Sequence, residues 1–176
     1  LHDALPISVL MLVYPRTQMR GALHIVLTRR TDTLRGHSGQ VSFPGGRMDP
    51  DDVSYVETAL RETCEELNVC NRAQLHVLGE LQTCYIPPSN YNVRPIVALM
   101  SSEPIMTPNP VEVAEVFSLS LEALLDPASK HSEPWTFYGQ TVDVPFYLVQ
   151  GHKVWGATAM MLSDLEQRLR LVLSQI

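Results

Sequence analysis

The chain has 176 residues, of which 45% are apolar and 18% charged, and its formal net charge is −6. At this length about two thirds of the surface of the unfolded chain can be buried, so a core can form without disulfides or a structural metal. This composition excludes disordered and fibrous proteins. The acidic balance argues against a nucleic-acid partner but leaves room for a small anionic ligand.

The predicted elements, in chain order, mix strands with two substantial helices. Strands are expected at residues 8–14, 22–28, 75–84, 93–100, 111–119 and 142–149. Helices are expected at residues 52–67 and 158–173, with a helical turn at 121–125 and an ordinary turn at 151–153. Asp51 or Asp52 is available as the N-cap of the first long helix. The pattern predicts a layered α/β domain.

Domain organisation and location follow from what the chain lacks. No repeat or linker divides it, which predicts one domain over residues 1–176, with residues 1–7 expected to be disordered or an appended end. The longest apolar runs fall far short of the roughly 20 residues that cross a bilayer, so we expect no membrane partner. Three cysteines, Cys64, Cys70 and Cys84, lack the paired spacing of a zinc site. We expect reduced thiols and a cytoplasmic location.

Charge is divided between two neighbouring segments. Residues 16–47 hold six arginines and one acid, Asp32, whereas residues 49–66 hold seven acids and one base, Arg61. The first segment could bind phosphates and the second a hard cation. Chance asymmetry between two exposed segments is the alternative.

Three carboxylates are concentrated on one face of the first long helix. Glu62, Glu65 and Glu66 stand at positions i, i+3 and i+4. Like charges at this spacing each cost about 0.2–0.5 kcal/mol, and a bound divalent ion such as Mg²⁺ would convert the repulsion into coordination. A solvated acidic face, with Arg61 paired to Glu57 or Glu65, is the alternative.

The residues before this helix make the signal specific. Phe43-Pro44-Gly45-Gly46, then Asp52, Arg61-Glu62 and Glu65-Glu66, resemble the Nudix box, a glycine-loop-helix signature of hydrolases acting on nucleoside diphosphates linked to another group. The chain departs from that signature twice. Asp52 lies one residue before the position of the usual helix-starting Glu, where Val53 stands, so it can be a cap instead of a metal partner. Asn68 replaces the closing Gly, and it tolerates the left-handed conformation that ends a helix.

Further motifs resemble one branch of that family. The segments 27–30 and 34–46, and the later landmarks Val93-Arg94-Pro95, Glu112-Val113-Ala114 and Trp155-Gly156-Ala157, are similar to the coenzyme A pyrophosphatases. The resemblance implies an α/β/α sandwich with a central mixed sheet, dependence on Mg²⁺ or Mn²⁺, and cleavage of coenzyme A or its derivatives to 4′-phosphopantetheine and adenosine 3′,5′-bisphosphate.

The resemblance also implies roles for individual residues. Glu62, Glu65 and Glu66 would ligate the metal, with Glu66 or Glu62 helping to deprotonate the attacking water, and Arg61 would orient these carboxylates. Glu112 is an additional ligand or base, or else an ordinary solvent-facing residue. The substrate contacts would be Arg35, His37, Gly45 and Gly46, although His37 could instead stabilise its loop.

The sequence is also compatible with other functions. The same metal helix could hydrolyse ADP-ribose, a dinucleoside polyphosphate or an oxidised nucleotide. A catalytically silent nucleotide-binding module is a second alternative, which the retained carboxylates disfavour. The oligomeric state, including a homodimer, is left open.

Overall fold

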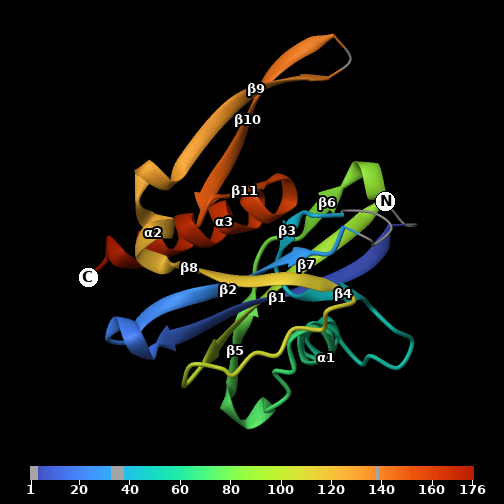
Figure 1. Ribbon diagram of the computed structural model, residues 1–176, viewed down its shortest axis with the longest axis vertical. Coiled ribbons are helices and arrows are strands. Elements are labelled where there is room, and N and C mark those ends of the chain that lie inside the picture. Colours follow the sequence, from blue (N-terminus) through green and yellow to red (C-terminus); the bar gives the residue numbers. More distant parts are fainter. Residues whose placement is uncertain (1–3, 33–37, 138) are drawn as a thin grey trace.

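Figure 1 shows the computed structural model, which describes residues 4–32, 38–137 and 139–176. The strands are β1 (Leu5–Arg16), β2 (Ala22–Arg30), β3 (Val41–Ser42), β4 (Gly45–Arg47), β5 (Leu75–Glu80), β6 (Cys84–Ile86), β7 (Tyr91–Met100), β8 (Val113–Ser120), β9 (Lys130–Phe137), β10 (Gln140–Val149) and β11 (His152–Trp155). The helices are α1 (Tyr55–Leu67), α2 (Leu121–Leu125) and α3 (Gly156–Leu173).

The centre of the molecule is a mixed sheet in the order β3-β2-β1-β7-β5, with β4 on β1, β6 on β7 and β8 on β2. β1 and β7 pair in parallel, and the other pairs in this sheet are antiparallel. β1 is buried over seven consecutive residues, because both of its faces are covered. The expected mixed central sheet between helical layers is confirmed, and the chain has an α/β sandwich fold.

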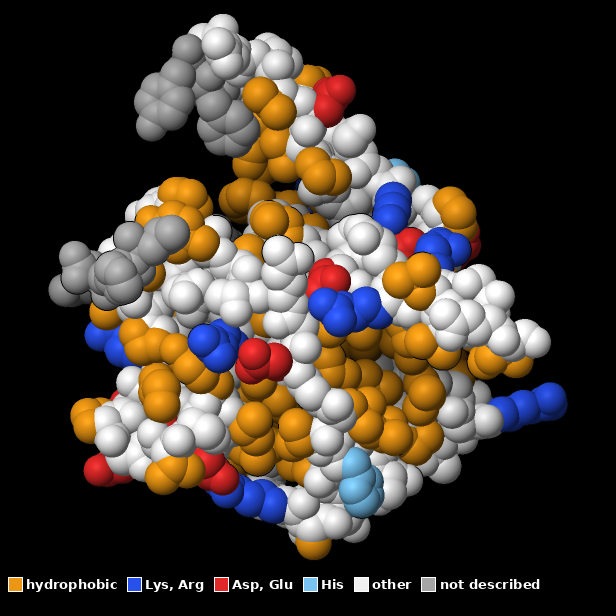
Figure 2. Space-filling model, turned by 180° about the vertical axis from the view of Figure 1, so that it is seen from behind, with side chains coloured by type: hydrophobic (Ala, Val, Ile, Leu, Met, Phe, Trp, Pro, Cys, Tyr) orange, Lys and Arg blue, Asp and Glu red, His pale blue; other side chains and the backbone are white. Residues whose placement is uncertain are grey.

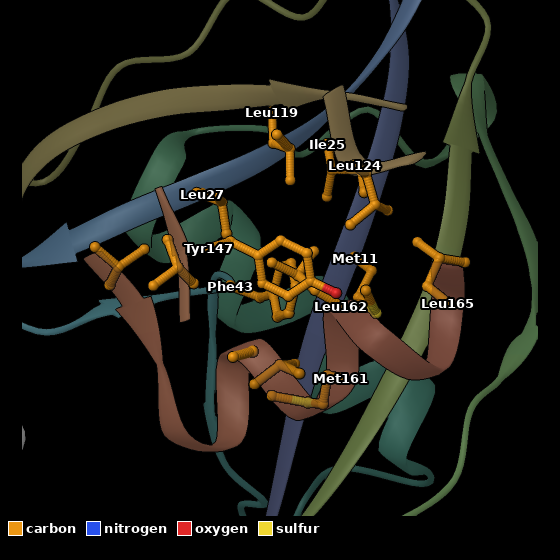
Figure 3. Close-up of a cluster of buried hydrophobic side chains, with 14 of the residues drawn as sticks. Met11, Ile25, Leu27, Phe43, Leu119, Leu124, Tyr147, Met161, Leu162 and Leu165 are labelled. Atoms are coloured by element: carbon orange, nitrogen blue, oxygen red, sulfur yellow. The ribbon is translucent and has the colours of Figure 1, made fainter. Parts of the chain in front are cut away.

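The two faces of the sheet carry separate cores. On one face, alternate β1 residues Leu10, Leu12 and Tyr14 pack with Leu60 and Leu67 of α1. On the opposite face, residues from β1, β2 and β8 pack with α2, α3 and the later strands. Figure 3 shows this second core, in which Tyr147 and Leu162 lie among Met11, Leu27 and Phe43. α1 therefore lies on one face of the sheet, and α2 and α3 lie on the other (Figure 1).

A second sheet, in the order β11-β10-β9, was not expected from the sequence. Residues 130–137 lack a clear alternation of apolar and polar side chains and contain Pro134, which normally disfavours a strand. The β9–β10 hairpin projects from the body of the molecule, with hydrophobic side chains at its base (Figure 2). A cavity of about 340 Å³ lies there between the hairpin and α3, lined largely by Val144, Pro145, Phe146 and Met160.

Several expected boundaries need correction. The strand expected at 75–84 is interrupted at residues 81–83, so that β5 ends at Glu80 and β6 begins at Cys84. β11 occupies the end of the expected turn at 151–153, which instead is made by Gln150 and Gly151 with positive φ. Leu5 to Ile7, expected to belong to an unstructured end, form the start of β1. Within the described residues, no helix is long and apolar enough to span a membrane.

Candidate metal and diphosphate site

α1 carries the candidate site, and local signals at both of its ends determine where it begins and stops. Ser54 is the N-cap, and its hydroxyl accepts a hydrogen bond from the Glu57 amide at 3.2 Å. The assignment of Asp51 or Asp52 as the cap is therefore wrong. Asn68 adopts the left-handed conformation at φ 60° and closes the helix, as its replacement of glycine suggested.

Two glycines allow the carboxylates to approach the backbone of β4. The Gly45 amide donates to Glu66 Oε2 at 3.2 Å, and Gly45 has φ +152°. A Cβ at this position would overlap the backbone of Ser8 and Val9 in β1. At Gly46 a Cβ would lie 2.5 Å from the carboxylate carbon of Glu62. Both glycines are thus required for close approach, Gly45 by the neighbouring strand and Gly46 by Glu62 itself.

Glu62 and Glu66 are both held in surroundings that disfavour a bare negative charge. Glu66 is 4% exposed. Burial raises its pKa to about 8, against the opposing effects of the Gly45 amide and Arg30, while Glu62 and Glu112 add to the rise. Burial also raises the pKa of Glu62, although Arg61 counteracts it. Glu65 is exposed. The cluster therefore has two desolvated carboxylates and one at the rim.

Arg61 is anchored by Asp52, which is the main function of Asp52 visible in the structure. Arg61 Nε donates to Asp52 Oδ1 at 3.0 Å and Nη2 to Oδ2 at 2.9 Å, a bidentate pair. Asp52 also accepts hydrogen bonds from the Thr58 hydroxyl and the Asp49 amide, each at 2.9 Å. These hydrogen bonds, with that of Arg61 foremost, hold the Asp52 pKa well below its usual range.

The other end of the Arg61 guanidinium faces the carboxylates. Nη1 donates to Glu62 Oε1 at 3.1 Å and to both Glu65 oxygens at 3.3 Å. The alternative pairing with Glu57 is wrong, because Glu57 binds Arg72 at 2.7 Å. Arg61 thus links the loop before the helix to two of its carboxylates.

Glu112 reaches this site from the loop before β8. Its charge raises the pKa of both Glu62 and Glu66, so it lies within electrostatic range of the cluster. Asn109 orients it, since Asn109 Nδ2 lies 3.4 Å from Glu112 Oε1. Glu112 is partly exposed, and its role as a ligand or base stays a prediction.

Arg30 is a site residue that reasoning from the sequence missed. It ends β2, and its Nη1 lies 4.0 Å from Glu66 Oε1, beyond hydrogen-bond distance. Its Nε is buried without a hydrogen-bond partner in the described structure. Strand alternation from Val26, which faces α1, was the signal that could have placed Arg30 on this face. Arg35 and His37, the predicted substrate contacts, lie outside the described residues.

The donor chemistry at this cluster fits a hard divalent cation. Every candidate ligand is a carboxylate oxygen, no lysine takes part in the ion pairs described for the cluster, and Gly46 leaves room for Glu62 at its base. In the described ranges, no three His, Cys, Asp or Glu side chains are already arranged to hold a metal ion. Arg61 occupies oxygens of Glu62 and Glu65, and Glu66 is turned toward the Gly45 amide. Binding a cation would require these side chains to reorient.

The cysteines also need correction, because Cys64 and Cys70 form a disulfide. The expectation of three reduced thiols is wrong for this pair. The chain reverses at Asn68, which brings Cys70 back beside the last turn of α1. Cys84 is a buried free thiol. With this disulfide present, the cysteines no longer indicate a reducing compartment.

A mixed sheet between helical layers, with a glycine loop leading into a carboxylate-bearing helix, defines a class of α/β protein with a candidate site for a divalent cation and a diphosphate. Comparison with known proteins identifies its family. The family model for the NUDIX domain matches residues 5–138. This chain belongs to the Nudix family, and it is a Nudix hydrolase, an enzyme of nucleoside diphosphate derivatives, in a family that generally uses divalent metal ions.

Curated relatives extend over most of the chain. An uncharacterized Nudix hydrolase, NudL, from Photorhabdus laumondii is 41% identical over 147 residues, which covers 84% of this chain and 78% of the relative. NudL of Yersinia pestis, also described as uncharacterized, is 38% identical, covering 84% and 73% of the two chains.

Solved structures share the fold at low identity. The Nudix hydrolase RenU from M. smegmatis superposes with a TM-score of 0.61 at 18% identity, covering 98% of this chain and 88% of RenU. The Nudix domain of Shewanella oneidensis NrtR, solved with ADP ribose, has a TM-score of 0.58 at 16% identity, with coverage of 95% and 89%. An Ap4A hydrolase from C. elegans gives 0.53 at 20% identity, over 66% of this chain and 80% of that structure.

Proposed function

We propose that this Nudix hydrolase cleaves the diphosphate of coenzyme A or a derivative of it, in the presence of Mg²⁺ or Mn²⁺, to 4′-phosphopantetheine and adenosine 3′,5′-bisphosphate. The observation that carries the hydrolytic part is the desolvated pair Glu62 and Glu66 beside the glycine loop, with Glu112 close by. The choice of substrate is supported by the similarity of residues 27–46 to the coenzyme A pyrophosphatase signature.

The proposed ligands are Glu62, Glu65 and Glu66, with Glu112 as an additional ligand or base. A divalent ion bound there would neutralise the diphosphate and supply a nucleophilic hydroxide at neutral pH. The chain itself supplies positioning. Arg61, held by Asp52, orients Glu62 and Glu65 without needing to touch substrate.

Substrate phosphates would be received on the arginine-rich side of the site. Arg30 presents a guanidinium toward Glu66 with a buried, unpartnered Nε, and this fits an anionic oxygen. Gly45 and Gly46 are proposed as further substrate contacts through their backbone, since the space that a side chain would take there is filled by β1 and by Glu62. Arg35 and His37 are proposed as contacts to the 3′-phosphate of coenzyme A.

The alternative is a different diphosphate substrate on the same metal helix. The structural neighbours solved with ADP ribose or described as an Ap4A hydrolase share this fold, so we keep ADP-ribose and dinucleoside polyphosphates as the second candidates.

A product assay decides between them. Coenzyme A, its acyl thioesters, its disulfide, ADP-ribose and Ap4A are incubated with Mg²⁺ or Mn²⁺, and the products are separated by chromatography. We expect the highest kcat/KM on a coenzyme A species and no turnover after chelation. Faster cleavage of ADP-ribose than of every coenzyme A species would overturn the substrate proposal, and activity that survives chelation would overturn the metal proposal.

A further inference from the structure

The disulfide between Cys64 and Cys70 lies at the end of the helix that carries the candidate ligands. Cys64 belongs to the last turn of α1, and Cys70 lies three residues beyond the helix. The Asn68 amide donates to the Cys64 carbonyl at 2.8 Å, and this turn brings the two cysteine Cα atoms to 4.7 Å. That separation lies in the range that a disulfide spans without movement of the backbone. The pair can therefore form or break its bond within one local turn.

Small reagents can reach this bond. Cys70 is exposed and Cys64 is partly exposed. A cavity of about 170 Å³ adjoins both cysteines and is lined by Arg61, Glu65 and Val69 among others. Cys84, in contrast, is 7% exposed and lies in the core between the sheet and α3. A small thiol would thus reach the disulfide in the folded protein and leave Cys84 untouched.

The turn that this disulfide closes is connected to the carboxylates of the site through α1 and through the loop before β8. Cys64 directly precedes Glu65, and Glu65 lines the same cavity. The backbone carbonyl of Glu66, the residue after Glu65, accepts a hydrogen bond from the Asn109 amide at 2.8 Å. Asn109 in turn orients Glu112. If the last turn of α1 loosens, the positions of Glu65, Glu66 and the loop that carries Glu112 should therefore change together.

We propose that Cys64 and Cys70 form a reversible thiol–disulfide modification site. Through this site, small thiols and small disulfides change the hydrolytic activity of the enzyme. In the reducing direction, a thiolate attacks the sulfur of Cys70, and Cys64 leaves with the electron pair of the broken bond and takes up a proton. A second thiolate then attacks the sulfur of the attached small molecule and releases Cys70 as a thiol. Two small thiols thereby become one disulfide, and their two electrons reduce the protein. A small disulfide reverses both steps.

The position of the bond favours reversibility. It closes a loop between residues only six apart, so it restricts the unfolded chain less than a long-range disulfide does. Exposed disulfides are also the labile ones in thiol exchange. Helix ends open more readily than helix centres, and the last turn of α1 should fray when the bond is absent. The oxidised form should therefore be the more active one.

The test uses the full-length folded protein. It is equilibrated with reduced or oxidised glutathione, alkylated without denaturant, and analysed by mass spectrometry. We expect reduction to add alkyl groups at Cys64 and Cys70 but not at Cys84. On the best substrate found in the product assay, kcat/KM should fall at least about threefold on reduction and recover with oxidised glutathione.

Matched variants separate this site from other thiol effects. Cys70→Ser should show the lower kcat/KM under both conditions, and Cys84→Ala should respond as the wild type does. Cys70→Ala provides the same test if the serine variant folds poorly. A disulfide that resists reduction until the protein is denatured would overturn the proposal, as would equal kcat/KM in the oxidised and reduced wild type. The alkylation experiment needs no substrate, so its result tests the thiol–disulfide exchange independently of the coenzyme A proposal.

Discussion

Burial raises the pKa of Glu62 and of Glu66. Substituting either residue therefore tests whether its carboxylate takes part in catalysis. Glu66→Gln keeps the shape of the side chain and removes the charge that a cation requires. We expect turnover to fall at least about 100-fold, the scale of losing one preorganised electrostatic contact. Steady-state kinetics of Glu66→Gln and Glu62→Gln measure the loss. Glu57→Gln, on the same helix and paired with Arg72, is the control and should retain near-normal turnover.

Substitutions of Gly45 and Gly46 test separately the packing of β4 on β1 and the position of the Glu62 carboxylate. The three atoms nearest to a methyl group at Gly46 all belong to the carboxylate of Glu62, so Gly46→Ala should fold and displace that carboxylate. We expect a tenfold or greater loss of kcat with little change in melting temperature. A methyl group at Gly45 meets the backbone of Ser8, so Gly45→Ala should lower the melting temperature markedly. Unchanged kcat in the Gly46 variant would argue against a role for Glu62.

Arg35 and His37 are the residues proposed to select coenzyme A over substrates that lack its 3′-phosphate. An arginine fork binds a terminal phosphate in a bidentate manner. Arg35→Ala should therefore lower kcat/KM on coenzyme A far more than on dephospho-coenzyme A, which lacks the 3′-phosphate. Parallel assays on the two substrates measure this difference, and equal losses would indicate general positioning instead.

At the scale of elements, the Asp52–Arg61 pair ties the loop after β4 to α1. Asp52→Asn removes the charge opposite the Arg61 guanidinium, whose other end holds Glu62 and Glu65. We expect kcat to fall about tenfold or more, because the carboxylates lose their orientation, while KM changes less. Asp49→Asn is a suitable control, since Asp49 is exposed and lies 3.7 Å from the same guanidinium. Equal effects of both substitutions would show that only the summed charge matters.

At the scale of the whole molecule, Glu166 joins the second sheet to α3. It is 2% exposed, accepts from the Tyr147 hydroxyl at 2.8 Å, and pairs with Lys130 at 2.6 Å and Arg170 at 2.9 Å. Burial acts to raise its pKa, but the hydrogen bonds from Lys130, Tyr147 and Arg170 outweigh that effect and hold the pKa below its ordinary value. The ionised carboxylate is therefore part of the packing between these layers.

Glu166→Gln should consequently destabilise the protein by about 2 kcal/mol at neutral pH, the scale of losing hydrogen bonds to a charged group. Because the folded pKa lies below the unfolded value of about 4.3, the contribution is present above that pH and disappears as the pH falls through the folded value. Urea unfolding of both proteins between neutral and acidic pH measures the difference. A difference that stays constant over this range would contradict the assignment to an ionised Glu166.

The sequence by itself determined the parts of this protein that depend on local spacing. Helical periodicity placed Glu62, Glu65 and Glu66 on one face, and the Gly45-Gly46 pair and Asn68 marked the loop and the helix end. The continuous apolar run at residues 8–14 indicated a strand, and the structure places β1 there. These features were predictable because each follows from the conformational preferences of a few neighbouring residues.

Only the tertiary structure decided the contacts between distant residues. The sequence offers Asp51 or Asp52 as the cap of α1, but the folded loop places the Asp52 carboxylate against Arg61, nine residues away. Arg30 and Glu112 reach Glu66 because the central sheet aligns the end of β2 with the loop before β8. The Cys64–Cys70 bond and the second sheet were likewise missed. Each depends on the path of the chain through space, since burial and pairing partners are set by packing and not by local sequence preference.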